Sequence, residues 1–336
     1  MGTDRYGRAI DYLRVSVTDK CNLRCIYCMP AEGVPFRNYD QMLSLEEIER
    51  FVAIAAQDGI KHVRLTGGEP LVRKGIVELV QHIADTPGIE SVAMTTNGIL
   101  LPRFASELKA AGLSRVNISL DTFDPDAYHM ITRRGDIDGA LAGIDAALEV
   151  GFSPVKVNAV VVRSLKQDFL GFARLSYERP IHVRFIEYMP VGESSGGQGT
   201  GWNESDVIPS EELCATIDRI GAAAGLGHLV AVEAGPNRPD GWGPAVYYRF
   251  PDAQGTIGFI SAESNHFCHT CNRLRLTSDG KIRPCLFSDT EYDVLSVVRN
   301  GSDDEVRRII DTAIFNKPEE HLDITGTKRK MSDIGG

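Results

Sequence analysis

The stretch that decides the fold reads YLRVSVTDKCNLRCIYC and spans residues 12–28. Residues 13–17 form a short run rich in β-branched side chains, which predicts a strand. Cys21, Cys25 and Cys28 follow this strand directly, in the order CxxxCxxC. A cubane [4Fe-4S] cluster takes four ligands, usually all thiolates, so three clustered cysteines would leave one iron without a protein ligand. That open iron is where a reactant could bind.

A structural zinc site is the alternative interpretation of the three cysteines. Zinc usually takes four protein ligands, often in two close pairs. The next candidate ligand, His62, falls inside an apolar strand pattern. The zinc interpretation therefore needs a distant fourth ligand.

Composition excludes several classes of protein. The hydrophobic content of 43% and charged content of 24% are ordinary for a globular protein. No stretch reaches the roughly 18 apolar residues of a membrane span, and the polar residues 1–8 do not resemble a signal peptide. The net charge of -10 argues against general nucleic-acid binding. We expect a cytoplasmic protein that binds neither membranes nor nucleic acids.

Six β-branched runs alternate with amphipathic segments in the first half of the chain. Such alternation predicts parallel strands joined by right-handed helical crossovers, here a partial (β/α)6 TIM-like barrel. Helix signals include a capping box at Ser44 and Glu47 and a stop at Gly59. The predicted strands are residues 13–17, 62–66, 91–95, 116–120, 155–161 and 183–187.

This alternation of predicted strands and helices ends after residue 187. Residues 192–201 are rich in glycine and serine and predict a loop. A helix is expected near 211–220, short strands near Val230, Val246 and Ile257, and a last helix at 304–315. We expect a barrel over residues 1–200 and a smaller C-terminal α+β domain over 201–336.

Charged residues interrupt four of the predicted strands. A buried charge without a partner is costly, so each should face solvent, an acidic group or an anionic ligand. An ion pair inside the barrel is the simplest alternative, whereas four cations from separate strands in one cavity would suit a triphosphate. These residues are Arg14, Arg64, Lys156 and Arg184.

A second group of cysteines lies near the C-terminus, with Cys268 and Cys271 in a CxxC pair and Cys285 further on. Zinc completed by His266 or His269 is the alternative to a second open cluster. Arg273 and Arg275 share one face if their segment is extended. The seventh cysteine, Cys214, is interpreted as a small apolar residue in a helix.

The segment CNLRCIYC, with Tyr27 before the third cysteine, resembles the signature of radical S-adenosylmethionine (SAM) enzymes. In that family the open iron of a [4Fe-4S] cluster chelates SAM, whose cleavage yields a 5′-deoxyadenosyl radical. GGEP at residues 67–70 resembles the family's segment for the SAM amino group. The resemblance assigns SAM contacts to Tyr27, Gly68, Thr95, Ser119 and Met189.

Across almost the whole chain the motifs resemble those of the GTP 3′,8-cyclase family, lyases of molybdenum cofactor biosynthesis. They include RLTGGEPL, TTNG, NISLD, VKVN, RFIEYMPVG, FCHTCNRLRLTSDGKIRPCLF and a terminal double glycine. The resemblance implies two [4Fe-4S] clusters and SAM as cofactors and GTP as substrate. The radical would remove hydrogen from C3′ of the ribose, and C3′ would then attack C8 of guanine.

The resemblance also implies roles for individual residues. The C-terminal cluster would bind the purine, and the nucleotide would contact Arg14, Arg64, Lys156, Arg273 and Arg275. Gly335 and Gly336 would reach into the active site, where only glycine threads a narrow channel. A frayed terminus is the alternative.

Partners follow from the same resemblance: an electron donor and a downstream pyranopterin-forming enzyme, with a homodimer also considered. Two other functions stay open at this point. One is a radical SAM maturase with an auxiliary cluster, although such enzymes typically carry more C-terminal cysteines. The other is a non-catalytic metal-binding or electron-carrier protein, which would usually saturate every iron with cysteine.

Overall fold

The computed structural model describes residues 2–35, 37–165, 167–189, 204–235, 238–320, 327 and 329–335. The loop expected at 192–201 and the role expected for Gly336 lie outside these residues. Within the described part, no helix is long and apolar enough to cross a membrane.

Six strands alternate with helices in the first half of the chain, as the sequence predicts. The strands are β1 (Tyr12–Ser16), β2 (His62–Thr66), β3 (Ser91–Thr96), β4 (Leu113–Ser119), β5 (Val155–Val161) and β6 (Ile181–Glu187). The helices are α1 (Leu45–Gln57), α2 (Ile76–Ala84), α3 (Leu101–Ala110), α4 (Pro125–Thr132), α5 (Ile137–Glu149) and α6 (Phe169–Glu178).

Local signals set the ends of several helices. Ser44 Oγ accepts from the backbone N–H of Glu47 at 3.2 Å, and Glu47 Oε2 accepts from the N–H of Ser44 at 2.8 Å, which confirms the predicted capping box. Gly59 follows the same helix with a φ of 106°. Such a left-handed position favours glycine and stops the helix where predicted.

The six strands run parallel in sequence order, and strands from the C-terminal half extend both sides of the same sheet. These are β7 (Val230–Ala231), β8 (Val246–Arg249), β9 (Thr256–Ile260), β10 (Arg273–Leu276), β11 (Lys281–Arg283) and β12 (Tyr292–Asp293). The described sheet has the order β12-β11-β10-β1-β2-β3-β4-β5-β6-β9-β8-β7. The barrel is thus partial, and the C-terminal strands widen it at both edges.

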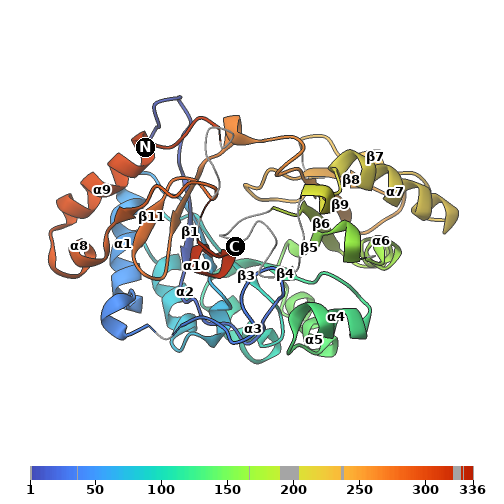
Figure 1. Cartoon of the computed structure of the whole chain (residues 1–336), viewed down its shortest axis with the longest axis horizontal. Coiled ribbons are helices and arrows are strands. Elements are labelled where there is room, and N and C mark those ends of the chain that lie inside the picture. Colours follow the sequence, from blue (N-terminus) through green and yellow to red (C-terminus); the bar gives the residue numbers. More distant parts are fainter. Residues whose placement is uncertain are drawn as a thin grey trace.

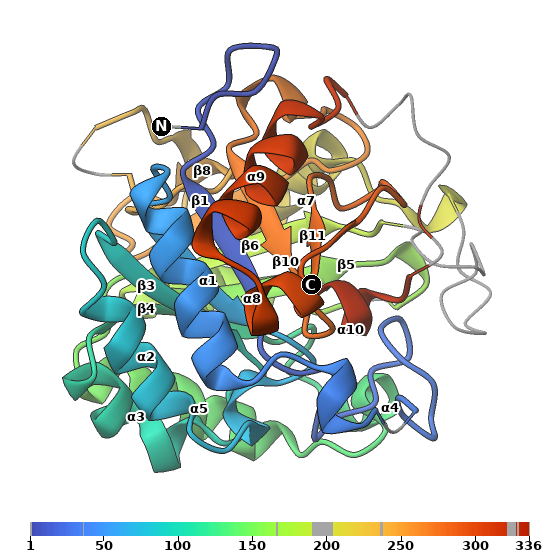
Figure 2. The same ribbon diagram turned by 90° about the vertical axis from the view of Figure 1, so that its left-hand side faces the viewer.

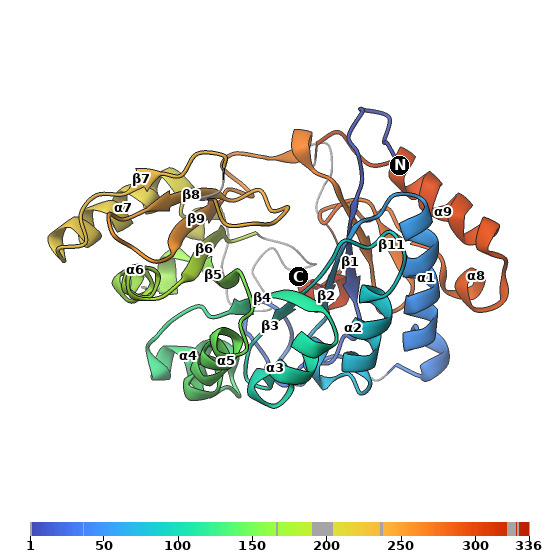
Figure 3. The same cartoon turned by 180° about the vertical axis from the view of Figure 1, so that it is seen from behind.

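The sheet bends into an arc with α1–α6 along its outer side, and the C-terminus lies inside the arc (Figure 1). The reverse view in Figure 3 shows the same arrangement. The outer helices bury one continuous apolar core against the strands, which includes Phe51, Leu65, Val116 and Phe172. Strand β2 is buried at all five positions, as expected for a parallel strand covered on both sides.

The remaining helices are α7 (Ser210–Ala223), α8 (Leu295–Asn300), α9 (Asp303–Phe315) and α10 (Met331–Ile334). Figure 2 shows α8 and α9 beside α1 at the outside of the sheet. The helices predicted at 211–220 and 304–315 correspond to α7 and α9. The short α10 replaces the featureless tail considered from the sequence. The domain boundary at residue 200 stays a prediction.

Candidate functional site

A cavity of about 300 Å³ lies inside the arc and is lined by most of the predicted site residues, but not by the cysteines of the second group. It is lined by the three cysteines of the first motif and by six cationic side chains. The cysteines are Cys21, Cys25 and Cys28, and the cations are Arg14, Arg64, Lys156, Arg184, Arg273 and Arg275. A chain with a net charge of -10 therefore gathers positive charge in one cavity.

Strand register brings three of these cations together. Arg14 on β1 pairs with Arg64 on β2 and with Arg275 on β10. Residues paired across parallel strands point to the same face of the sheet, so their side chains lie side by side. Arg273 pairs with Tyr12 two residues earlier and shares this face. This pairing explains why the charges that interrupt the strands converge.

Burial and mutual repulsion weaken the charged forms of these cations. Burial, followed by Arg184, Arg64 and Arg115, lowers the pKa of Lys156 to about 6. Burial, followed by Arg273, lowers the pKa of Arg275 to about 10. A polyanionic ligand would relieve both penalties, because it supplies the missing opposite charge.

The alternative of ion pairs inside the barrel does not account for three of the strand cations. Arg184 Nε donates to Asn158 Oδ1 at 2.9 Å, and Arg64 Nε donates to the hydroxyl of Tyr12. Lys156 Nζ donates to the backbone carbonyl of Asp240. These hydrogen-bond partners are uncharged, so they hold the three side chains in place without supplying an opposite charge.

The turn from Asp240 to Pro244 closes the cavity near the amino-terminal ends of the strands. Trp242 stacks on His62 with ring centroids 3.5 Å apart, and the Arg115 guanidinium lies 4.0 Å from the indole ring centroid. Arg115 also pairs with Asp240 at 2.8 Å. Sequence analysis missed Arg115 because its predicted strand began at residue 116. It also treated the glycine-rich turn as a connection, although Trp242 was a signal for packing.

The three cysteines after β1 are half-buried and lie close to one another. Burial, followed by Cys21, Asp333 and Asp121, raises the pKa of Cys28 to about 12. Burial and the neighbouring Cys28 likewise raise the pKa of Cys25. Three such thiolates are unfavourable unless a cationic metal centre compensates them, which fits an iron–sulfur cluster. The residues that would hold it are Cys21, Cys25 and Cys28.

In the described part of the chain, no three His, Cys, Asp or Glu side chains converge as ligands of one metal ion. The thiolates of a cubane bind different irons, so they need not converge as the ligands of a zinc ion do.

The predicted SAM residues Tyr27, Gly68, Thr95, Ser119 and Met189 all line the cavity. A Cβ on Gly68 would lie 2.4 Å from the carbonyl oxygen of Lys20, so only glycine fits against the loop that leads to the cysteines. Arg64 Nη1 donates to Thr95 Oγ1 at 3.4 Å.

Two carboxylates, those of Glu69 and Asp121, lie in the cavity wall with the predicted SAM residues. Glu69 accepts from the backbone N–H of Leu71 at 3.0 Å and of Asn97 at 2.7 Å, while burial raises its pKa to about 7. Asp121 accepts from the hydroxyl of Tyr27 at 2.6 Å, and its burial raises its pKa to about 6. Both side chains line the cavity, so both lie where a bound cofactor would meet them.

Glu187, at the end of β6, is a buried hub that the sequence analysis did not single out. Its carboxylate accepts from the N–H and hydroxyl of Ser210, both at 2.8 Å. It also accepts from the N–H groups of Glu263 and Ser264, both at 2.9 Å, and from the Ser264 hydroxyl. The hub ties the segment that carries Met189 to the segment that leads to the second cysteine group.

The second cysteine group lies beside the cavity, whose wall includes its neighbours Phe267, Arg273 and Leu286. Cys285 and Cys271 both raise the pKa of Arg275, which places the two thiols around one guanidinium. Burial opposes ionisation of Cys271, but Lys317 and Arg273 outweigh it and lower the pKa of that thiol to about 7. This environment favours the thiolate of Cys271, the form in which a cysteine binds an iron–sulfur cluster.

The two histidines considered as zinc ligands differ in their surroundings. His266 directs Nδ1 to the carbonyl oxygen of Ala262 at 2.9 Å, and His269 is exposed. Cys268 begins a short helical turn whose carbonyl accepts from the N–H of Cys271 at 3.1 Å. Cys214 lies half-buried on α7 against the apolar core, as interpreted from the sequence.

The C-terminal tail reaches the same cavity. Arg275 Nη1 donates to the carbonyl oxygen of Gly335 at 3.1 Å. A Cβ on Gly335, whose φ is 76°, would lie 2.9 Å from Ser16 Cβ and 3.0 Å from Thr66 Cγ2. Gly335 therefore occupies a narrow, buried position between the ends of β1 and β2 where glycine is required.

Comparisons with known proteins show the family of this chain. Residues 15–175 match the radical SAM superfamily, and residues 181–323 match the family described as Molybdenum Cofactor Synthesis C. A GTP 3′,8-cyclase of Pelotomaculum thermopropionicum is 49% identical, and one of Heliobacterium modesticaldum is 50% identical, each over 99% of both chains. The chain belongs to the GTP 3′,8-cyclase family.

Radical SAM proteins outside the GTP 3′,8-cyclase family share the fold. SuiB of Streptococcus suis bound to S-adenosylmethionine is 17% identical with a TM-score of 0.61, covering 91% of this chain and 68% of that chain. At this identity the likeness shows only the fold. Family membership agrees with the cofactors expected from the sequence, which are SAM and two [4Fe-4S] clusters.

Proposed function

We propose that this chain is a radical SAM lyase that converts GTP to (8S)-3′,8-cyclo-7,8-dihydroguanosine 5′-triphosphate, the first step of molybdenum cofactor biosynthesis. One observation carries the proposal: a single cavity joins the three cysteines of the CxxxCxxC loop to six cations. The relatives from Pelotomaculum thermopropionicum and Heliobacterium modesticaldum, both GTP 3′,8-cyclases, support the same activity.

The cations hold the nucleotide in this proposal. Arg14, Arg64 and Arg275 are paired in register, so their guanidinium groups form a row that matches a chain of phosphates. Lys156 lies further around the sheet and takes up a proton when the anion arrives, because its pKa of about 6 rises beside negative charge. Arg273 lies toward the second cysteine group and would meet the part of the nucleotide nearest to it.

When bound, a cluster held by Cys21, Cys25 and Cys28 and its SAM supply one-electron radical chemistry at the ribose. The chain's own residues orient SAM: the close-packed backbone at Gly68, the Tyr27 hydroxyl fixed by Asp121, and Met189 near the Glu187 hub. The turn at Trp242 keeps water from the opposite end of the cavity.

Cys268, Cys271 and Cys285 would hold the second cluster beside the substrate. Lys317 and Arg273 lower the pKa of Cys271, which prepares a thiolate ligand at neutral pH. Because Arg275 donates to the carbonyl of Gly335, and because Cys285 and Cys271 oppose the lowering of its pKa by burial, it would join the second cluster, the substrate and the tail.

The decisive experiment uses GTP deuterated at C3′. Anaerobic, reconstituted protein is incubated with dithionite, SAM and the labelled GTP, and 5′-deoxyadenosine is analysed by mass spectrometry. We expect deuterium in 5′-deoxyadenosine and formation of the cyclic nucleotide, both dependent on GTP. Deoxyadenosine that forms equally without GTP, or that carries no deuterium, would contradict the proposal and favour a peptide- or protein-modifying enzyme.

The partners and compartment are part of the proposal. The radical chemistry needs a separate electron donor, and the cyclic product needs a pyranopterin-forming enzyme to consume it. We place these steps in the cytoplasm, where reducing conditions suit thiolate ligands. A homodimer is considered beside these partners, and sedimentation of the reconstituted protein tests it. A carrier without catalytic activity would fail the deuterium experiment altogether.

A further inference from the structure

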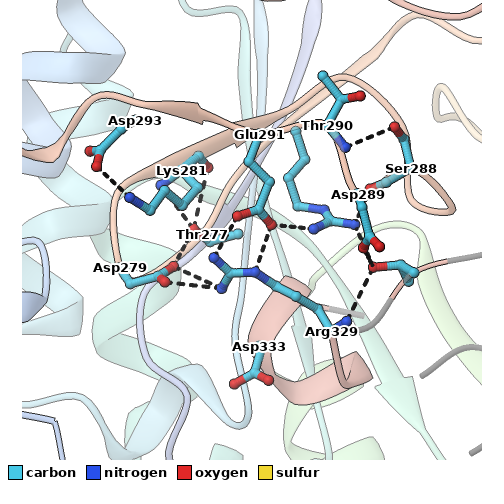
Figure 4. Close-up of polar contacts among 12 residues, drawn as sticks. Thr277, Asp279, Lys281, Ser288, Asp289, Thr290, Glu291, Asp293, Arg329 and Asp333 are labelled. Atoms are coloured by element: carbon cyan, nitrogen blue, oxygen red, sulfur yellow. Dashed lines mark hydrogen bonds and ion pairs between the residues drawn. The ribbon is translucent and has the colours of Figure 1, made fainter. Parts of the chain in front are cut away.

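The described end of the C-terminal tail lies against Arg275 in the proposed active site. The helix α10 is only four residues long. A single turn of helix is not stable by itself, so other contacts must hold the tail inside the arc. Those contacts form a charged network, shown in Figure 4, between the tail and the segment from Thr277 to Asp293.

Arg329 is the centre of this network. Its Nη1 contacts the two carboxylate oxygens of Asp279 at 3.1 and 3.0 Å. On its other side, Nη2 contacts Glu291 Oε2 at 2.7 Å and Nε contacts Glu291 Oε1 at 2.6 Å. One guanidinium thus bridges two carboxylates that flank strand β11 (Figure 4). All three side chains are at most one-fifth exposed, so solvent screens the contacts only partly.

A second arginine joins the tail to the loop that carries Cys285. Arg283 is fully buried and pairs with Glu291, and its Nη2 donates to Thr327 Oγ1 at 2.9 Å. The Thr327 hydroxyl also contacts Asp289 Oδ1 at 2.7 Å. Residues 283–291 therefore hold a cluster cysteine and the start of the tail at once.

The far end of the tail contacts Arg37, which follows the first cysteine group in sequence and also reaches Asp19 before that group. Arg37 Nη2 lies 3.4 Å from Asp333 Oδ1, and Arg37 Nη1 lies 3.2 Å from Asp279 Oδ2. Its Nε lies 3.6 Å from Asp19, two residues before Cys21. Asp279 accordingly links Arg37 to Arg329.

From these contacts we propose that Arg329 is a positioning residue, which docks the tail through Asp279 and Glu291 so that Gly335 stays on Arg275. The effect that this role should have on turnover rests on the proposed function. The docking itself is a property of the folded chain. Only arginine offers a planar fork able to meet two carboxylates at once, whereas lysine offers a single charged point.

Hydrogen–deuterium exchange of the full-length, cluster-loaded protein tests the docking directly. The readout is the exchange rate of a peptide that covers residues 329–335. Within it the N–H of Gly335 donates to Met331 at 3.1 Å, and that of Asp333 donates to Lys330 at 3.0 Å. We expect Arg329→Gln to speed exchange here by about tenfold, because opening the tail then costs less free energy. Arg329→Lys should give an intermediate rate.

A second variant addresses the tail without removing a charge. Thr327→Val keeps the shape of the side chain but removes its contacts with Arg283 and Asp289. It should also speed exchange in the peptide while leaving the segment 277–293 folded. The matched control is Arg299→Gln, since Arg299 contacts Glu47 at 2.6 Å and anchors the carbonyls of Asp40 and Met42 away from the tail.

Turnover distinguishes docking from the function it serves. With the iron content unchanged, Arg329→Gln should lower kcat for the cyclic nucleotide, and the Arg299→Gln control should not. Unchanged exchange of residues 329–335 in both Arg329→Gln and Thr327→Val would overturn the docking role. Faster exchange in a protein whose wild type does not turn over GTP would leave docking intact and count against the proposed function alone.

Discussion

Trp242 stacks on His62 with ring centroids 3.5 Å apart and planes inclined by 21°. His62 begins β2, whereas Trp242 lies in a turn that is remote in sequence and precedes β8. The contact therefore fastens the C-terminal half of the chain to the amino-terminal end of the barrel strands. Because Asp240 in the same turn holds Lys156 and Arg115, the stack also places two cations.

Replacement of this indole should loosen the turn. We expect Trp242→Ala to lower the free energy of unfolding by about 2 kcal/mol, since packing and aromatic stacking are lost. The KM for GTP should rise roughly tenfold, which corresponds to about 1.4 kcal/mol. Thermal unfolding and steady-state kinetics measure the two effects. Trp242→Phe, which keeps a ring on His62, serves as the control and should recover most of both.

The depressed pKa of Lys156 predicts a proton uptake on nucleotide binding. At pH 8 the free side chain is largely neutral, because its pKa is about 6, and a bound triphosphate restores its charge. Calorimetric titration of GTP in buffers of different ionisation enthalpy should reveal uptake of about one proton. The uptake should disappear in Lys156→Met. An equal uptake in that variant would assign the proton to another group.

The same group links stability to pH. The pKa of Lys156 is lower in the folded chain than its ordinary value of 10.5, so the unfolded chain binds more protons between pH 6 and 10.5. Stability should therefore rise with pH across this window, and Lys156→Met should flatten the rise. Denaturant unfolding at several pH values measures the slope. A slope that is identical in the two proteins speaks against this assignment.

The two cysteine groups should be separable by iron analysis. The wild type should hold about eight irons per chain, and Cys25→Ala and Cys271→Ala should each hold about four, because each cubane contains four. Only Cys25→Ala should abolish formation of 5′-deoxyadenosine. Cys214→Ala is the control and should keep the full iron content. A colourless wild-type protein that contains zinc in place of iron would contradict this prediction.

Removal of one Glu187 oxygen tests the hub after β6. Glu187→Gln should lower the free energy of unfolding by about 2 kcal/mol, because an amide nitrogen cannot accept from the surrounding donors. The hydrogen bonds of the folded state hold its pKa below the ordinary value despite burial. Its stabilisation is thus present above pH 4.5 and is lost as the pH falls through the lowered pKa. In acid unfolding, the free energies of unfolding of the wild type and of Glu187→Gln should therefore approach each other as the pH falls.

Local signals in the sequence were enough for the first half of the fold. The β-branched runs and the capping box at Ser44 predict elements because strand and helix propensities act over a few neighbouring residues. The cysteine spacings and the cations within strands likewise located most of the cavity lining. The positions of Arg14 and Arg64 on one face follow from parallel pairing alone.

Contacts between segments that are far apart in the sequence could not be predicted. Nothing local indicates that β10 pairs with β1, or that the turn at Trp242 packs on the barrel, since both depend on contacts between distant segments. The same holds for Arg329, whose tail looked featureless until Asp279 and Glu291 were brought next to it.

The pairing of β1 with β10 has a consequence for how the protein is made. Tyr12 at the start of β1 pairs with Arg273, so one side of this strand stays unpaired until most of the chain has left the ribosome. The loop with Cys21, Cys25 and Cys28 follows β1 and is therefore attached to a strand that lacks its second partner for most of synthesis. Loading of the first iron centre is therefore expected to follow translation. A chain that stops before β10 should leave one edge of β1 unpaired and aggregate through it.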